Sequence, residues 1–147
     1  MLIDRSGQPC YKEAMSSLFT KIYHQEIPGI VVAENDLAFV IMDKFPIRAG
    51  HLLVIPKKEV AHLFDLSTEE FKEFMEFVQQ ISKVLLEVSQ AKRIGILVEG
   101  FGVEEHAHLH LVPITGPGQL NMSLAKEASL SQLQIFADKF TAKWQLK

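Results

Sequence analysis

The most regular hydrophobic pattern in the chain predicts a long amphipathic helix over residues 67–89. Ser67 and Glu70 form the S-x-x-E capping pattern, in which each side chain accepts a hydrogen bond from a backbone N–H of the first turn. Apolar residues then recur every three or four positions, which gathers them on one helix face: Phe71, Phe74, Met75, Val78, Ile81, Leu85 and Val88. Weaker patterns of the same period predict helices over 14–24 and 123–143.

Five short β-rich runs predict strands at residues 30–34, 37–42, 51–55, 93–99 and 107–114. Asn35 and Asp36 separate the first two runs and predict a two-residue hairpin loop, since Asn and Asp tolerate the left-handed backbone conformation. Mostly consecutive strands with one inserted and one appended helix indicate an α+β fold with a mainly antiparallel five-stranded sheet. Residues 1–10 show neither the helical period of three to four residues nor the strand period of two, so we expect an irregular arm there.

Composition narrows the class of protein. The 147 residues fit a single domain, and 48% of them are hydrophobic, which indicates a packed core. A net charge of −3 argues against a nucleic-acid-binding surface. Cys10 is the only cysteine, so no internal disulfide forms. No apolar run approaches the roughly 18 residues of a membrane span, and the N-terminus lacks a secretory pattern. We therefore expect a cytoplasmic protein without a membrane partner.

The stretch "HAHLHLVPI" at residues 106–114 holds three of the six histidines at alternate positions. Successive strand residues point to opposite faces, so His106, His108 and His110 share one face, with neighbours about 7 Å apart. The intervening apolar residues face the other way and are expected to lie buried under a helix: Ala107, Leu109 and Leu111.

Three interpretations of these histidines remain open on the residues alone. The first is a half-buried strand whose polar face happens to carry His. The second is a metal site, because imidazole is the commonest zinc ligand, with His51, His62 or Glu99 as further ligands. The third is chemistry at phosphorus, in which one imidazole attacks and the others act as donors. Gly100 and Gly102, just before the histidines, favour phosphate because glycine lets backbone N–H groups approach an anion.

The pattern His-φ-His-φ-His-φ-φ, with φ apolar, resembles the signature of the histidine triad (HIT) family of nucleotide hydrolases and transferases. Residues 18–43 are similar to the family's first helix and hairpin, and "PIRAGHLLVIPKKEV" (46–60) is similar to its third-strand segment. The resemblance covers about 15–114 and leaves 115–147 as a C-terminal helical extension. It implies a HIT-like fold that pairs as a homodimer with a continuous sheet.

The resemblance also implies a mechanism. His108 would attack the α-phosphorus of a nucleoside phosphate derivative, expected to be a purine phosphoramidate or phosphoanhydride, and form a nucleotidyl-histidine that water or another acceptor resolves. His106 and His110 would flank the phosphate, and His51 would face the same site. No metal or other cofactor is needed. The implied nucleotide-binding residues are Asp43 for the ribose and Leu18, Phe19 and Ile22 for the nucleoside. Each of these has a simpler structural interpretation, as a core, turn or surface residue.

Three departures from the family pattern put the substrate in question. Val98 stands where many members carry Asn, and the loop "GFGVEEH" lacks a phosphate-binding Gly-Gln-Ser/Thr element. Glu104 and Glu105 precede His106 and are unfavourable beside a phosphate unless they point away. The family's structural zinc ligands are replaced, so no structural zinc is predicted; the matching positions are Ser17, Thr20 and Glu59. The alternative function is a non-catalytic nucleotide- or metal-binding module.

Overall fold

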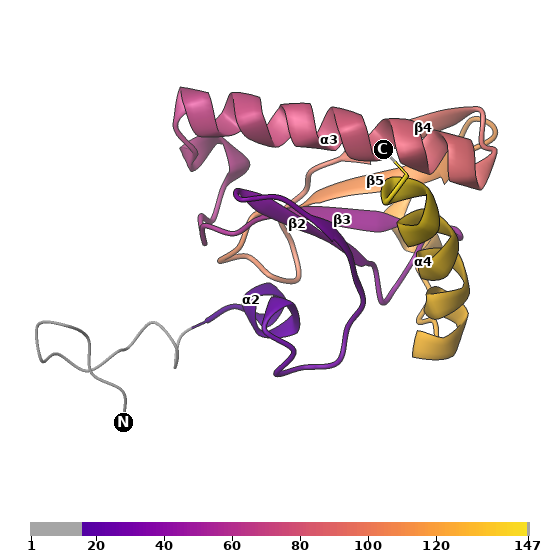
Figure 1. Ribbon diagram of the computed structural model, residues 1–147, viewed down its shortest axis with the longest axis horizontal. Coiled ribbons are helices and arrows are strands. Elements are labelled where there is room, and N and C mark those ends of the chain that lie inside the picture. Colours follow the sequence, from indigo (N-terminus) through magenta and orange to yellow (C-terminus); the bar gives the residue numbers. More distant parts are fainter. Residues whose placement is uncertain (1–15, 147) are drawn as a thin grey trace, which may run out of the picture.

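The computed structural model describes residues 16–146, which form a five-stranded antiparallel sheet with helices on both faces (Figure 1). Residues 1–15, which include Cys10 and the whole of the expected arm, and residue 147 lie outside the described residues. The elements are α2 (Leu18–Tyr23), β1 (Val31–Glu34), β2 (Ala38–Met42), β3 (Leu52–Pro56), η1 (Leu63–Asp65), α3 (Thr68–Ser89), β4 (Arg93–Leu97), β5 (Leu109–Ile114), η2 (Met122–Leu124) and α4 (Leu130–Trp144).

The strand order is β1-β2-β3-β5-β4, and every neighbouring pair is antiparallel. This confirms the α+β class and the five strands predicted from the sequence. The central strands β2 and β3 are buried along their whole length because α3 lies along one face of the sheet and α2 on the other (Figure 1). The capping box at Ser67 and Glu70 begins α3 as predicted.

Alternate residues of the strands feed two separate apolar cores. On the α3 side, Val54 and Leu109 pack with the apolar face of the helix, and Ala107 and Leu111 join them as expected. On the α2 side, the smaller core contains Phe19, Phe39, Ile41, Leu53 and Ile55. The period of two along each strand therefore sends His108 and His110 to the α2 side, opposite the main core.

The β1–β2 hairpin differs from the expected two-residue loop. Three residues, 35–37, connect the strands, and neither Asn35 nor Asp36 has a positive φ. The Asn35 side chain instead accepts hydrogen bonds from the N–H groups of Leu37 (2.9 Å) and Ala38 (2.8 Å). An Asx turn of this kind replaces the left-handed turn, because the side chain itself satisfies the loop donors.

The C-terminal helix begins later than residue 123. Ser129 caps α4 through a capping box with Gln132, whereas Met122–Leu124 form only a 3₁₀ turn. Between them the chain runs extended, because Lys126 N–H donates to the Pro46 carbonyl (3.2 Å) and Ala128 N–H donates to the Lys44 carbonyl (3.0 Å). The helix is anchored on the α3 side by Leu133, Ala137 and Phe140. None of the helices described here is long and apolar enough to cross a membrane.

Candidate active site

A cavity of about 490 Å³ lies on the α2 side of the sheet and receives most of the predicted site residues. Its lining includes six of the predicted side chains together with Gly102: Leu18, Phe19, Ile22, Asp43, His108 and His110. Three further predicted residues, His51, His106 and Gly100, do not line it. A larger cavity of about 790 Å³ elsewhere contains no histidine and none of the predicted residues.

His108 lines the cavity with one ring nitrogen committed to the backbone. Its Nδ1 lies 2.9 Å from the carbonyl oxygen of His106, which can only accept, so Nδ1 carries the proton. The neutral ring then keeps its lone pair on Nε2. The edge of the Phe19 ring, with centroids 4.9 Å apart, packs against this imidazole and fixes its plane. The carbonyl of His106 and the Phe19 ring together orient this imidazole.

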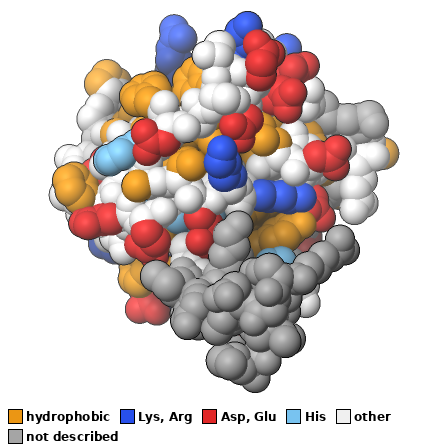
Figure 2. Space-filling model, turned by 90° about the vertical axis from the view of Figure 1, so that its left-hand side faces the viewer, with side chains coloured by type: hydrophobic (Ala, Val, Ile, Leu, Met, Phe, Trp, Pro, Cys, Tyr) orange, Lys and Arg blue, Asp and Glu red, His pale blue; other side chains and the backbone are white. Residues whose placement is uncertain are grey.

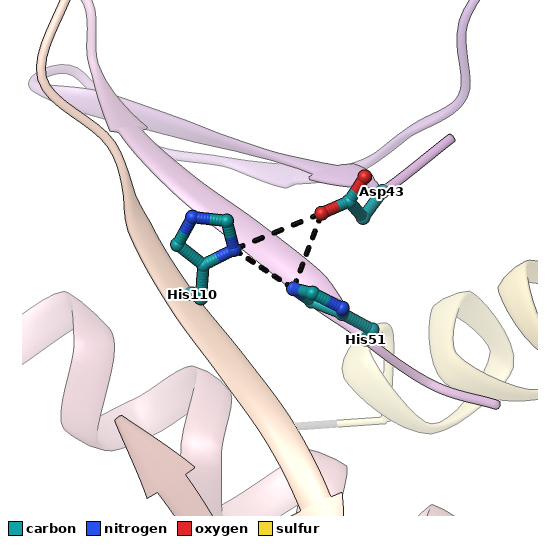
Figure 3. Close-up of side chains that lie close together, drawn as sticks. All are labelled: Asp43, His51 and His110. Atoms are coloured by element: carbon teal, nitrogen blue, oxygen red, sulfur yellow. Dashed lines mark hydrogen bonds and ion pairs between the residues drawn. The ribbon is translucent and has the colours of Figure 1, made fainter. Parts of the chain in front are cut away.

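A chain of hydrogen bonds fixes the proton positions on the neighbouring imidazoles (Figure 3). Ile47 N–H donates to His51 Nδ1 (2.9 Å), so the proton of the neutral His51 ring is on Nε2. That Nε2 lies 2.9 Å from His110 Nδ1, which therefore accepts. The neutral His110 ring is left with its proton on Nε2, so it presents an N–H donor. Residue types could not have indicated the Ile47 contribution, because any residue except proline supplies a backbone N–H.

Asp43 closes a triangle with these two rings at the end of β2. Its Oδ2 lies 3.2 Å from His51 Nε2 and 3.7 Å from His110 Nδ1, and its Oδ1 accepts from Phe45 N–H (2.8 Å). Burial raises the pKa of Asp43 to about 6, which the Phe45 hydrogen bond partly opposes. Burial, reinforced by a neighbouring histidine in each case, lowers the pKa of His51 to about 3 and that of His110 to about 4. At neutral pH both imidazoles are uncharged.

The loop between Asp43 and His51 is held from both ends. Asp43 N–H donates to the His51 carbonyl (3.1 Å), which joins the end of β2 to the start of β3. Gly50 has a φ of +89°, and a Cβ there would lie 2.7 Å from the Phe136 ring of α4. Only glycine fits this approach and conformation, so the residue before His51 is fixed by the C-terminal helix.

Asp43, His51 and His110 also form a group that could hold a metal ion. Their ligand atoms are 2.9, 3.2 and 3.7 Å apart, near the roughly 3.3 Å edge of a tetrahedron with Zn–N bonds of about 2.0–2.1 Å. The proton positions oppose this use. A metal on His51 Nε2 would move the ring proton to Nδ1, where it would face the Ile47 N–H. The hydrogen bonding therefore fits a proton-holding cluster better than a metal centre. His62 and Glu99, the other metal candidates, are exposed and do not line the cavity.

His106 lies in a different environment from His108 and His110. Its side chain is fully buried, with both ring nitrogens engaged: Nε2–H donates to the Pro56 carbonyl (2.6 Å), and Nδ1 accepts from the Ser17 hydroxyl. This differs from the expected position beside the phosphate. The reason lies in its partners, because hydrogen bonds to the Pro56 carbonyl and the Ser17 hydroxyl hold the His106 ring outside the cavity lining. Burial lowers the pKa of His106, and the carboxylate of Glu59 partly opposes this.

The positions matched to structural zinc ligands form a hydrogen-bonded cluster, here called the Glu59 cluster: Ser17, Thr20, Glu59 and His106. Glu59 Oε1 accepts from Ser17 N–H (2.7 Å) and from the Thr20 hydroxyl (2.6 Å). Ser17 then links the carboxylate to His106. These bonds tie the start of α2 to the residue whose carbonyl orients His108.

The loop before the histidines brings apolar rather than polar groups to the cavity. Gly100 and Gly102 have φ values of +75° and +86°, and the Phe101 side chain between them lines the cavity while 69% exposed. Glu104 and Glu105 are exposed and do not line the cavity. The two carboxylates that seemed unfavourable therefore point away from the histidines that face it.

Three further lining residues come from the C-terminal segment, which the expected site did not include: Met122, Leu130 and Leu133. In the sequence these are indistinguishable from ordinary core positions of an amphipathic helix. Only the path of residues 122–129 against the loop after β2 brings them to the cavity.

Comparisons with known proteins agree with this geometry. A family model described as "HIT domain" matches residues 24–116. The chain is 33% identical over 93 residues to an AP-4-A phosphorylase of Mycobacterium tuberculosis, covering 60% of this chain and only 48% of that protein, about half its length. It is 31% identical over 101 residues to an adenosine 5′-monophosphoramidase of Schizosaccharomyces pombe, covering 67% and 74%.

Among solved structures, a Hit-like protein involved in cell-cycle regulation from Bartonella henselae superposes with a TM-score of 0.75 at 30% identity, covering 87% of this chain and 96% of that one. The agreement extends over the sheet and both helical faces, well beyond the histidine stretch itself. The chain belongs to the histidine triad (HIT) family.

Proposed function

We propose that this protein cleaves a nucleoside phosphate derivative at its α-phosphorus, at a phosphoramidate or phosphoanhydride bond, through a nucleotidyl intermediate on His108. The observation that carries the proposal is the ring of His108, which lines the cavity with Nδ1–H bound to the His106 carbonyl and, among residues 16–146, with no hydrogen-bond partner on Nε2. The phosphorylase and phosphoramidase activities of the two curated relatives belong to the same general class of reaction.

In the proposed first step, Nε2 of His108 forms a bond to phosphorus while the bond from phosphorus to the leaving group breaks. The leaving atom keeps that electron pair and takes a proton from the cluster of Asp43, His51 and His110. The carboxyl of Asp43, whose pKa burial raises to about 6, is the proposed source of this proton, since part of it is protonated just below neutral pH. The Nε2–H of His110 donates to the phosphoryl oxygens as charge develops there.

In the second step, water attacks phosphorus and the P–Nε2 bond breaks. His108 regains its neutral form, and the proton that the water loses restores the cluster. The sum is hydrolysis to a nucleoside monophosphate and the protonated leaving group. Each step uses side chains that the fold already positions, and no proton is gained or lost over the cycle.

The charges around the cavity favour a substrate with a single phosphorus. Of the lysines and arginines within residues 16–146, only Lys44 lines the cavity, and its Nζ lies 3.8 Å from Glu127. Polyphosphate chains are usually neutralised by clamps of Arg, Lys or a metal ion. We therefore expect a higher kcat/KM for adenosine 5′-phosphoramidate than for diadenosine tetraphosphate. The opposite order would assign the protein to the polyphosphate substrates instead.

We also propose a homodimer that pairs through β4. This strand is at one end of the sheet order, and beside it an apolar groove runs along α3. Ile96 and Leu86 are large apolar residues exposed at this groove, as in surfaces that become covered on association. Sedimentation of the full chain would test the pairing. A nucleic-acid partner is not proposed, since on the face drawn in Figure 2 acidic and basic side chains lie interspersed among apolar ones.

The decisive experiment is capture of the intermediate. Full-length protein is mixed with adenosine 5′-phosphoramidate, quenched within the first turnovers and examined by intact-mass spectrometry for an added AMP group. The adduct is expected in the native protein and absent in His108→Ala. His62→Ala is the matched control, because His62 is exposed and does not line the cavity. Tight nucleotide binding without adduct or AMP release would favour the non-catalytic binding module.

A further inference from the structure

The C-terminal segment is built onto the part of the cavity that follows Asp43. Two backbone hydrogen bonds, from Lys126 N–H and Ala128 N–H, join it to the carbonyls of Pro46 and Lys44. Its two ends are fixed as well, by the Asn121 side chain that caps η2 and by the Ser129 capping box of α4. The segment therefore has a defined path across the cavity rather than that of a free tail.

This path brings two accessible apolar side chains to the cavity. Met122 is half-buried and Leu130 is 39% exposed, and both line it. Leu133 lies behind them and is buried in the main core. Across the cavity, the apolar side chains of α2 and of the chain that follows it complete the lining: Leu18, Ile22 and Ile27.

The polar lining is confined to a few side chains. Among the described lining residues, the charged or hydrogen-bonding side chains are Asp43, Lys44, His108 and His110. The two histidines and Asp43 stand at the end where the proposed reaction takes place, and Lys44 pairs with Glu127 at 3.8 Å. Apart from Lys44, no described lining side chain is therefore left to read the hydrogen-bonding edge of a base. The remaining surface offers contact area alone.

We propose that Met122 and Leu130 form the outer wall of a base subsite, and that this subsite holds the base of a nucleotide by apolar contact with little discrimination between purines. The inference rests on the proposed function for the orientation of the nucleotide, with its phosphate at His108. It assigns a role in substrate binding to the segment after residue 116, outside the part matched by the family model.

Binding of AMP to the full chain, measured by calorimetry, tests the wall without requiring turnover. Leu130→Ala is expected to raise the Kd about tenfold, the effect of losing roughly two methylene-sized groups of contact. Leu130→Met, which preserves the apolar contact, should restore most of the affinity. Ile135→Ala is the matched control, since Ile135 is on the same helix, is 63% exposed and does not line the cavity.

GMP should bind within about threefold of AMP, because an apolar subsite gains similar area from both purines. A Leu130→Ala variant that binds AMP as native protein does, or a preference of more than about tenfold between the purines, overturns the wall proposal. These outcomes are separable from failure of the proposed function. If AMP binding depends on Leu130 but the protein shows no turnover, the proposed reaction is wrong and the proposed base subsite wall is supported. Absence of AMP binding by native protein would overturn both.

Discussion

His106 and His108 are two residues apart in one motif, yet they lie in contrasting regions of the molecule. His108 lines a cavity and leaves one ring nitrogen free, whereas His106 is fully buried with both nitrogens hydrogen-bonded in the Glu59 cluster. Identical residue types at a regular spacing therefore have different surroundings, because their hydrogen-bond partners differ. We expect the region around His108 to serve the proposed reaction and the Glu59 cluster to hold α2 against the sheet, so substitutions should separate activity from stability.

The largest effect is expected for His108→Ala. Loss of the group that bonds to phosphorus should lower the rate of AMP release by at least about 10²–10⁴-fold. Because the ring makes a single hydrogen bond, to a carbonyl, the free energy of unfolding should change far less than the activity. The rate is measured with adenosine 5′-phosphoramidate under saturating substrate, and stability by urea unfolding. Native-like turnover would contradict the assignment of the nucleophile.

His51→Ala is expected to weaken turnover without abolishing it, by about 10- to 10²-fold. The substitution removes the donor that fixes the tautomer of His110, and it leaves Asp43 without its nearest imidazole. The loss should appear in kcat more than in KM, since His51 does not line the cavity. A purely larger KM at unchanged kcat would show that the cluster serves binding rather than proton transfer.

The Glu59 cluster is expected to show the opposite pattern. Ser17→Ala removes both a helix cap and the hydroxyl that donates to His106, and should cost about 1–3 kcal/mol of stability. Ser129→Ala is a matched control, because Ser129 caps α4 without contacting a histidine. The difference between the two variants isolates the His106 hydrogen bond. Two results would contradict this distinction between the regions. One is an equal loss of stability in Ser17→Ala and Ser129→Ala, and the other is a kcat in Ser17→Ala as low as that of His108→Ala.

The smallest effect is a pH dependence of stability. In the folded chain the pKa values of His51 and His110 are lowered from 6.5 to about 3 and about 4, so stabilisation is complete above pH 6.5. It is lost as the pH falls, since the unfolded chain takes up protons that the folded chain does not.

Asp43 acts in the opposite direction, because its pKa is raised from 3.8 to about 6 and folding favours its protonated form below that pH. Two histidines against one carboxyl leave a net loss of about 1–2 kcal/mol between pH 6.5 and 5. Urea unfolding at the two pH values measures it. Stability that rises towards pH 5 would show that the cluster is charged in the folded chain.

Residue patterns along the chain predicted most of the regular elements, because the signals for these elements are local. The capping box at Ser67 and Glu70 and the recurrence of apolar residues fixed α3, and alternation along "HAHLHLVPI" fixed which residues enter the main core. Such signals have a limit at Asn35. The sequence predicted a left-handed turn there, whereas the structure has an Asx turn, and the same residue suits both conformations.

The residues that face and enclose the cavity could not be predicted from local patterns. The backbone N–H of Ile47 sets the proton positions on His51 and His110, and a backbone group leaves no trace in residue identity. The burial of His106 away from the cavity follows from its hydrogen bonds to Pro56 and Ser17, and the path of residues 122–129 from hydrogen bonds to a loop some eighty positions earlier. Such contacts join residues distant in the chain, so no local period encodes them.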